Sequence, residues 1–298
     1  MSMDYPTQIP YFADSAILPE PIPTEAQIRG SKDVLREIGV HKVVGVGPHF
    51  VVKYGTLDVI EAQNMIFVRR QTKIPVPRVY AIFETADKKC VFFVIERTQG
   101  KTLASVWSDM SNAQKNIVLQ KLQAYFEELS RLPSPGYYGS IGRRQLMSGM
   151  FWIGDGAGDR IPAITGPFDT EAQLNEGIVG RSISISSDTG EPPWKGKFYR
   201  RSFPAVFHGH PPVFTHGDFQ PKNVMVRSIS PSSSVAQSYE VTIIDWATSG
   251  WYPSYWEYCS ASWAFNWEDD WSEKIELVIK PYRVEYAWMQ LLTYELGA

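Results

Sequence analysis

The residues most capable of chemistry lie in one short segment, in which His216 is followed by Asp218 and then by Asn223. Random placement of the chain's 5 His, 14 Asp and 6 Asn would produce this spacing about 0.005 times. Another acid, Asp245, directly follows the apolar run Val241–Ile244. An Asp at the end of a buried strand is costly unless it binds a cation or hydrogen-bond donors.

These residue types fit phosphoryl transfer, which needs Mg²⁺ on the nucleotide phosphates and a carboxylate that deprotonates the attacking hydroxyl. Asp218 fits the catalytic base. Asn223 and Asp245 fit the metal ligands, because Mg²⁺ prefers oxygen ligands and keeps several of its waters. Each residue alone would be expected to cap a buried turn, but the three together favour catalysis.

Two motifs carry a resemblance to known proteins: His216-Gly217-Asp218 with Asn223, and Ile243-Ile244-Asp245-Trp246. They resemble the catalytic motifs of aminoglycoside phosphotransferases and choline kinases, small-molecule relatives of protein kinases. The wider similarity covers about residues 43–262 and is closest to the fungal branch. The resemblance implies an α+β, protein-kinase-like fold of two lobes, with a small β-rich N-lobe and a larger, mainly helical C-lobe. It also implies ATP (or GTP) and Mg²⁺ as cofactors.

The resemblance assigns four nucleotide-binding residues. Lys53 should hold the phosphates, Glu61 should orient Lys53, and the backbone at Glu96 and Thr98 should face the base. A single Lys or Glu is more often a solvated surface residue, so these roles rest on position in the pattern. No G-x-G-x-x-G precedes Lys53. A catalytically weak, kinase-like binding protein therefore stays open as the alternative to an active kinase.

The chain is expected to divide into an extended arm (1–23), an N-lobe (24–99) and a C-lobe (100–298). A capping box at Thr24 predicts a helix from there to about Ile38. The stretch from Gly39 to Lys53 then leaves room for one hairpin rather than three strands. Residues 181–212 are interpreted as a long connection.

Composition limits the partners. The 298 residues carry a net charge of −3 and only two cysteines. Because there is no basic excess, no nucleic-acid partner is expected. No apolar run is long enough to span a membrane, and a cytoplasmic location is expected. Seven residues separate Asp245 from Pro253, too few for a peptide-docking segment, so the acceptor should be a small molecule.

Residues 228–273 contain no Lys, Arg or His, but hold seven acids and six of the ten Trp. Such a surface would attract a cationic acceptor, such as an aminoglycoside, choline or another amino alcohol. The candidate acceptor residues are Trp256, Glu257, Glu268, Asp269 and Asp270. The competing interpretation, which stays open, is that these tryptophans are core residues and that these acids begin a helix.

Overall fold

A computed structural model describes residues 8–151, 161–229, 238–264 and 269–297. The chain divides into two compact units, each assembled from two segments. The first unit comprises Met1–Ser105 and Lys222–Ala247, and the second comprises Val106–Pro221 and Thr248–Ala298. These units do not coincide with the expected lobes, because residues 222–247 pair with the first part of the chain through strands described below.

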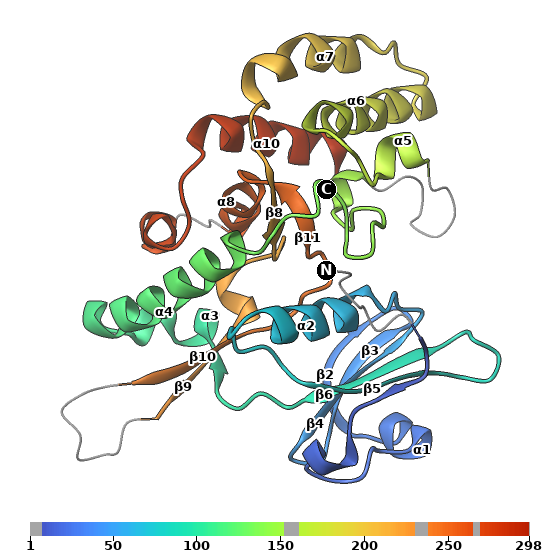
Figure 1. Ribbon diagram of the computed structural model, residues 1–298, viewed down its shortest axis with the longest axis vertical. Helices are drawn as coiled ribbons and strands as arrows, with labels where there is room; N and C mark the ends of the chain where they lie inside the picture. Colours follow the sequence, from blue (N-terminus) through green and yellow to red (C-terminus); the bar gives the residue numbers. More distant parts are fainter. Residues whose placement is uncertain (1–7, 152–160, 230–237, 265–268, 298) are drawn as a thin grey trace. The chain divides into compact units, whose positions relative to one another are not determined.

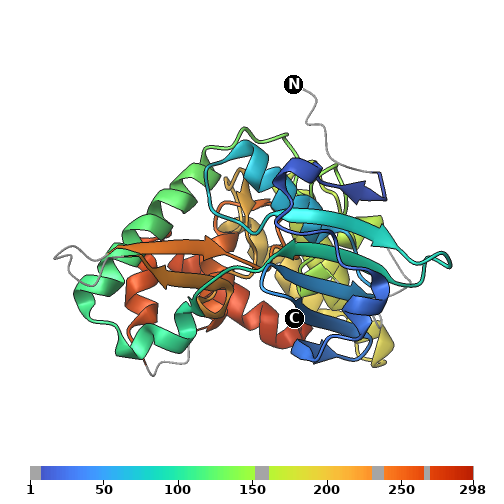
Figure 2. The same cartoon turned by 90° about the horizontal axis from the view of Figure 1, so that it is seen from below.

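The first unit contains a six-stranded antiparallel sheet with the order β1-β5-β6-β4-β3-β2 (Figures 1 and 2). Its strands are β1 (Tyr11–Phe12), β2 (Asp33–Ile38), β3 (His41–Val46), β4 (Phe50–Gly55), β5 (Val79–Glu84) and β6 (Val91–Glu96). The arm preceding residue 24 thus contributes an edge strand, since Tyr11 and Phe12 pair with β5.

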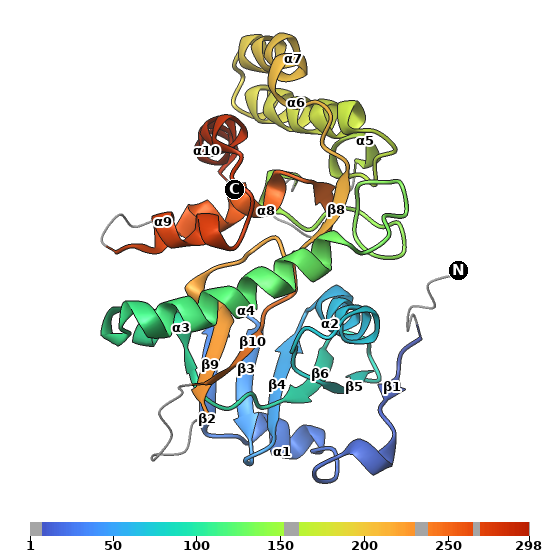
Figure 3. The same cartoon turned by 60° about the vertical axis from the view of Figure 1, so that its left-hand side comes forward.

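The two faces of this sheet differ in what they hold. Alternate side chains of the central strands point to one face and pack on Ile28 of helix α1 (Glu25–Arg29); they include Val44, Val52 and Phe92. The register pairs Val43 with Lys53, so these two side chains share the other face. Helix α2 (Ile60–Gln71), which is labelled in Figure 3, carries Glu61. The carboxylate of Glu61 is the partner of Lys53 on that face.

The predicted helix from Thr24 to Ile38 is wrong beyond its first turns. The capping box of Thr24 and Gln27 forms, but the helix ends at Arg29, and residues 33–38 are β2. Pairing with β3 through the turn at Gly39, whose φ is +56°, outweighs the local helical signals. Three strands therefore lie between α1 and α2, where the sequence predicted a single hairpin.

A second sheet of the first unit has the order β10-β9-β7 and carries two predicted site residues at its ends. Its strands are β7 (Lys101–Thr102), β9 (Val224–Ser228) and β10 (Tyr239–Ile243). Asn223 directly precedes β9, and Asp245 follows β10 by two residues. Since β9 and β10 are antiparallel, with Val224 opposite Ile243, these two residues lie at the same end of the ladder.

The second unit is mainly helical, with a two-stranded ladder of β8 (Pro212–Thr215) and β11 (Gly250–Pro253) (Figure 1). Its helices are α4 (Asn112–Ser130), α5 (Pro162–Thr165), α6 (Glu171–Asp188), α7 (Trp194–Val206), α8 (Trp256–Ala261), α9 (Trp271–Lys274) and α10 (Arg283–Leu296). Helix α3 (Leu103–Val106) lies where the chain passes between the units. Short 3-10 turns cover Ser15–Ile17, Trp107–Asp109, Gly149–Phe151, Pro221–Asn223, Ser262–Ala264 and Ile275–Leu277.

The long connection predicted over 181–212 is wrong, because α6 runs to Asp188 and α7 follows it at Trp194. The serines of α6 are weak helix formers, but Ser182 and Ser186 are buried, and α6 packs against α7 (Figure 3). Tertiary packing thus decides this segment. Among the described residues, no helix has the length and apolar character needed to cross a membrane.

Candidate active site

The first unit brings together three residues predicted from the sequence. The ammonium of Lys53 lies 2.5 Å from Glu61 Oε1 and 3.0 Å from Asp245 Oδ1. All three side chains are largely buried, with exposed fractions of 19%, 9% and 27%. Burial alone would lower the pKa of Lys53, but the two carboxylates outweigh it and raise this pKa above its usual value. Lys53 is therefore a fixed cation at neutral pH.

Asp245 is held in an uncommon backbone conformation. Its φ is +67°, in the left-handed region that non-glycine residues seldom occupy. The neighbours on both sides are tied down: Ile244 N donates to Asn223 O at 2.9 Å, and Trp246 O accepts from Asn64 Nδ2 at 2.8 Å. Conformations of this kind cost on the order of 1–3 kcal/mol and persist where the surroundings enforce them, often at functional sites.

Asn64 belongs to the site although it was not predicted from the sequence. It lies three residues after Glu61 on α2, so both project from neighbouring positions of the helix. Its side chain has no exposed surface. The available signal was the run of polar residues Glu61, Gln63 and Asn64 among apolar ones, since buried polar side chains require partners.

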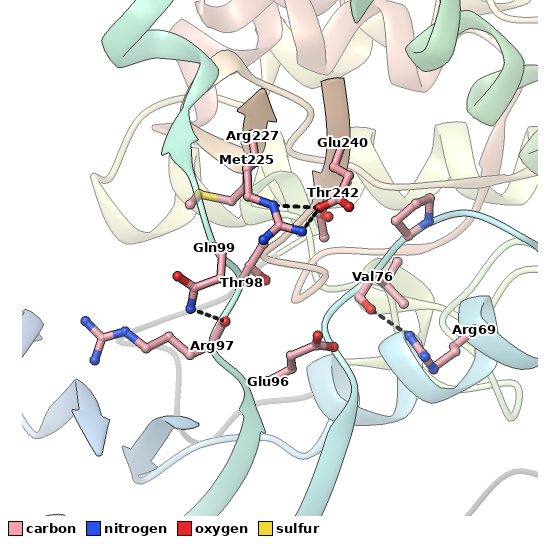
Figure 4. Close-up of a pocket in the computed structure, with 11 residues that line it drawn as sticks. Arg69, Val76, Glu96, Arg97, Thr98, Gln99, Met225, Arg227, Glu240 and Thr242 are labelled. Carbon is pink, nitrogen blue, oxygen red and sulfur yellow. Dashed lines mark hydrogen bonds and ion pairs between the residues drawn. The ribbon is translucent and has the colours of Figure 1, made fainter. Parts of the chain in front are cut away.

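The segment after β6 borders a cavity of about 350 Å³ (Figure 4). Both predicted base-binding residues, Glu96 and Thr98, line it. Glu96 is fixed on two sides, because its backbone N–H donates to Arg78 O at 2.8 Å and its carboxylate accepts from Arg78 N at 3.1 Å. The ion pair of Arg227 with Glu240, drawn in Figure 4, forms another wall of this cavity.

The second unit holds Asp218 on the loop that follows β8. His216 has no exposed surface, and its Nδ1 accepts from the backbone N–H of Asp218 at 3.2 Å. Gly217 has a φ of +82°, and a Cβ there would lie 2.8 Å from Thr248 O. Gln220 donates from its side-chain amide to Asp218 Oδ1, which orients the carboxylate. The loop is thus tightly defined around the predicted base.

Glu257 supports this loop from within the core. Its carboxylate accepts from the backbone N–H of His216 at 2.5 Å and from that of Gly217 at 3.2 Å. Burial raises the pKa of Glu257 to about 8, while these two hydrogen bonds oppose the rise and the charge of Asp218 adds to it. Glu257 was predicted as an acceptor residue; in the structure its carboxyl group binds the backbone of the loop that carries Asp218.

Three further predicted acceptor residues are engaged elsewhere in the second unit. Trp256 has no exposed surface and stacks on Tyr252 with ring centroids 4.8 Å apart. Asp270 accepts from Lys115 at 2.7 Å and from Trp107 Nε1 at 2.9 Å. Partial burial would raise the pKa of Asp270, but these contacts lower it.

Asp269 Oδ1 accepts from Trp271 N at 2.9 Å at the start of α9. The fifth candidate, Glu268, lies outside the described residues. These contacts agree with the competing interpretation, in which Trp256 is a core residue and Asp269 and Asp270 begin a helix. They agree less well with direct contact to an acceptor. A cluster of Trp and acids in the sequence does not reveal which of its members are buried.

The chain belongs to the phosphotransferase enzyme family, whose profile matches residues 59–291. The comparison with curated proteins found no significant match. Among solved structures, the chain is similar to a GDP complex of a mutant aminoglycoside 2′-phosphotransferase-IIIa, with a TM-score of 0.55 and 12% identity. That alignment covers 89% of this chain and 83% of the other.

Two other similar structures are a streptomycin–ATP ternary complex of APH(2″)-IIa and an ADP complex of APH(2″)-Ib. Their TM-scores are both 0.54, with 11% and 13% identity. The first alignment covers 89% of this chain and 83% of the other, and the second covers 88% and 80%. These similarities show that the chain has the α+β, protein-kinase-like fold of aminoglycoside phosphotransferases.

Proposed function

We propose that this protein transfers the γ-phosphoryl group of ATP or GTP to a hydroxyl of a small molecule, in a Mg²⁺-dependent reaction. The buried cluster of Lys53, Glu61 and Asp245 is the observation that carries the proposal. Burying three charged groups is costly, and an apolar trio of the same volume would serve stability at least as well. The cluster is therefore better explained by binding of nucleotide phosphates than by stability.

Each side chain of the cluster has a role in nucleotide binding. Lys53 contributes a permanent positive charge to the phosphates, and Glu61 holds its ammonium in place. Asn64 fixes the backbone next to Asp245 by binding Trp246 O. Asp245 is thereby presented in one orientation before any ligand arrives, which lowers the conformational cost of binding.

Asp245 and Asn223 are the residues that would hold Mg²⁺. Their carboxylate and amide oxygens are the hard donors that this ion prefers, and the Ile244–Asn223 hydrogen bond joins the two segments that carry them. The described part of the chain has no group of three His, Cys, Asp or Glu that could enclose a metal. This suits an ion that completes its shell with phosphates and water. When bound, Mg²⁺ neutralises charge on those phosphates.

Asp218 is proposed as the base that accepts the proton of the acceptor hydroxyl. Its carboxylate is oriented by Gln220, and its backbone by the contacts of His216 and Glu257. A base of this kind contributes about 10²–10⁴-fold to the rate. Two of the solved structures similar to this chain are complexes of their own proteins with streptomycin and with kanamycin. For this chain, we propose a hydroxyl-bearing small molecule as acceptor.

The tryptophans and acids of residues 228–273 are no longer used to argue for an amine-bearing acceptor. Trp256 is buried, and Glu257 and Asp270 bind other groups of the protein. The alternative function is nucleotide binding without transfer. One observation favours it: the turn between β2 and β3 has only two residues, Gly39 and Val40, in place of a glycine-rich phosphate loop. Measuring transfer itself separates the two functions.

Nucleotide binding can be tested first, without knowing the acceptor. Addition of MgATP at 100 times its Kd should stabilise the wild-type chain by about 2.7 kcal/mol, which would raise Tm by roughly 5–11 °C at 2–4 °C per kcal/mol. Asp245→Ala should lose this rise, since it removes the proposed metal carboxylate. The matched control is Asp109→Ala, which removes an exposed carboxylate from the second unit. An equal rise in Asp245→Ala and wild type would contradict the proposed site.

A further inference from the structure

An ion pair lies on the same face of the large sheet as Lys53. Arg97 Nη1 donates to Asp33 Oδ2 at 2.6 Å and to Gly47 O at 3.2 Å. Asp33 begins β2, and Arg97 is the first residue after β6. The pair therefore joins the edge strand of the sheet to the segment that holds Glu96 and Thr98. The backbone N–H of Arg97 is also fixed, donating to His49 O at 2.8 Å.

The Asp33–Arg97 ion pair lies over strand β3 at the position of Gly45. In the sheet register, Asp33 is opposite Gly45, and Gly45 is opposite Val51. A Cβ on Gly45 would lie 2.2 Å from Asp33 Oδ2 and 2.4 Å from Arg97 Nη1. Any side chain at position 45 would displace the pair. The absence of a side chain at Gly45 thus makes room for the guanidinium of Arg97 next to β3.

The location of the pair follows from the strand geometry. Val51 and Lys53 are two residues apart on β4 and share a face, so they are about 7 Å apart along the strand. The Gly45–Val51 pair lies toward the end of β4 where β6 ends, since Phe50 is opposite Glu96. A nucleotide with its phosphates at Lys53 and its base near Glu96 and Thr98 would extend along this face, toward Arg97.

We propose that Arg97 contacts the purine base of the nucleotide and that Asp33 holds its guanidinium in place for this contact. The proposal rests on the nucleotide-binding part of the proposed function. A planar guanidinium stacks on aromatic rings and binds ring nitrogens, which an aliphatic side chain cannot do. The side chain of Arg97 has an exposed fraction of 32%, so part of it is open to a ligand.

In Figure 4 the Arg97 side chain extends away from the other residues drawn around the cavity. Residues of its segment line that cavity, while its guanidinium pairs with Asp33 on the Lys53 face of the sheet. A base near Glu96 and Thr98 would therefore meet a side-chain cation in addition to backbone groups. Arg97 is therefore expected to contribute to the affinity for the base and not to the affinity for the phosphates.

Calorimetric titration of the full chain in excess Mg²⁺ tests this, with ATP and inorganic tripolyphosphate as the two probes. Arg97→Ala should weaken ATP binding on the order of tenfold and leave tripolyphosphate binding unchanged. Gly45→Ala, which displaces the pair without removing a charge, should weaken ATP binding in the same selective way. Arg36→Ala is the matched control, since it removes an exposed cation from the same strand as Asp33.

Two results would overturn the inference: ATP affinity unchanged in Arg97→Ala, or an equal loss for ATP and tripolyphosphate, which would indicate a general effect on the fold or on phosphate binding. Arg97→Lys provides a second variant that retains the charge and loses the planar group; it should share the selective loss. If the wild-type chain binds neither probe, nucleotide binding itself fails, and this inference fails with it.

Discussion

Two buried acids, Glu61 and Glu257, hold other groups of the proposed site in place through their hydrogen bonds. Glu61 holds the ammonium of Lys53, and Glu257 holds two backbone N–H groups of the loop that carries Asp218. Both were singled out in the sequence, but only Glu61 was given the role that its contacts support. A carboxylate among aromatic residues is equally compatible with a pocket wall and with a buried support. Its hydrogen bonds distinguish the two roles.

Glu257 should make stability depend on pH. Its pKa is about 8 in the folded chain, against an ordinary value of 4.5. The folded state therefore binds more protons between these two values, and its stabilising contribution is complete below pH 4.5 and lost as pH rises through about 8. Glu257→Gln removes this titration. Thermal unfolding between pH 6 and pH 9 should show a smaller loss of Tm for Glu257→Gln than for wild type.

The matched control for that experiment is Glu191→Gln, which changes an exposed carboxylate of the same unit and should retain the wild-type pH dependence. Glu257→Ala is expected to be more harmful, because it leaves the N–H groups of His216 and Gly217 without their acceptor. Each unsatisfied group costs about 1–3 kcal/mol. Identical pH profiles for Glu257→Gln and wild type would show that Glu257 does not titrate in this range.

At the scale of elements, the β2–β3 hairpin is distinguished by the exposure of its outer strand. Every residue of β2 is exposed, and its apolar members, such as Val34 and Leu35, are about half exposed. Such a strand has few packing contacts to hold it beyond its ladder with β3 and the Asp33–Arg97 pair. Edge elements with little burial open most readily, which would suit a segment that covers the proposed nucleotide site.

Gly39→Val tests whether the hairpin covers the nucleotide. The φ of +56° at this turn disfavours a β-branched residue by roughly 1–2 kcal/mol, and no atom lies within 4 Å of the added Cβ, so the cost is conformational. We expect faster amide exchange in residues 33–46 and weaker ATP binding, with little change in global Tm. Val40→Thr, at an exposed position of the same turn, is the control. Faster exchange with unchanged ATP affinity would contradict a covering role.

For the whole molecule, the residues of the Lys53 cluster could be singled out from the sequence more readily than the elements around them could be predicted. Lys53, Glu61 and Asp245 were singled out because each stands at a position fixed by its motif, and the structure brings the three side chains together in the first unit. The strand β2 and the helix α7 were missed, because pairing and packing partners distant in sequence decided them. Local propensity carries no information on such partners.

The acceptor side was the least predictable part of the molecule. The same residue types, Trp, Asp and Glu, build the core beneath the catalytic loop and would also build a pocket for a cation. Only burial and hydrogen bonds separate these uses, as the contacts of Asp270 with Lys115 and Trp107 show. Acceptor chemistry is thus best identified by experiment on the whole protein.

The most direct test of the proposed function measures transfer from γ-³²P-ATP, with Mg²⁺, to a mixture of hydroxyl-bearing metabolites that includes amino alcohols, aminoglycosides and neutral sugars. Wild-type protein should label at least one of them. Asp218→Asn, which keeps the shape of the side chain, should reduce labelling by about 10²-fold or more while retaining the rise in Tm with MgATP. Undiminished transfer by Asp218→Asn would contradict its role as the base, and MgATP binding with no transfer by wild type would contradict the proposed kinase activity.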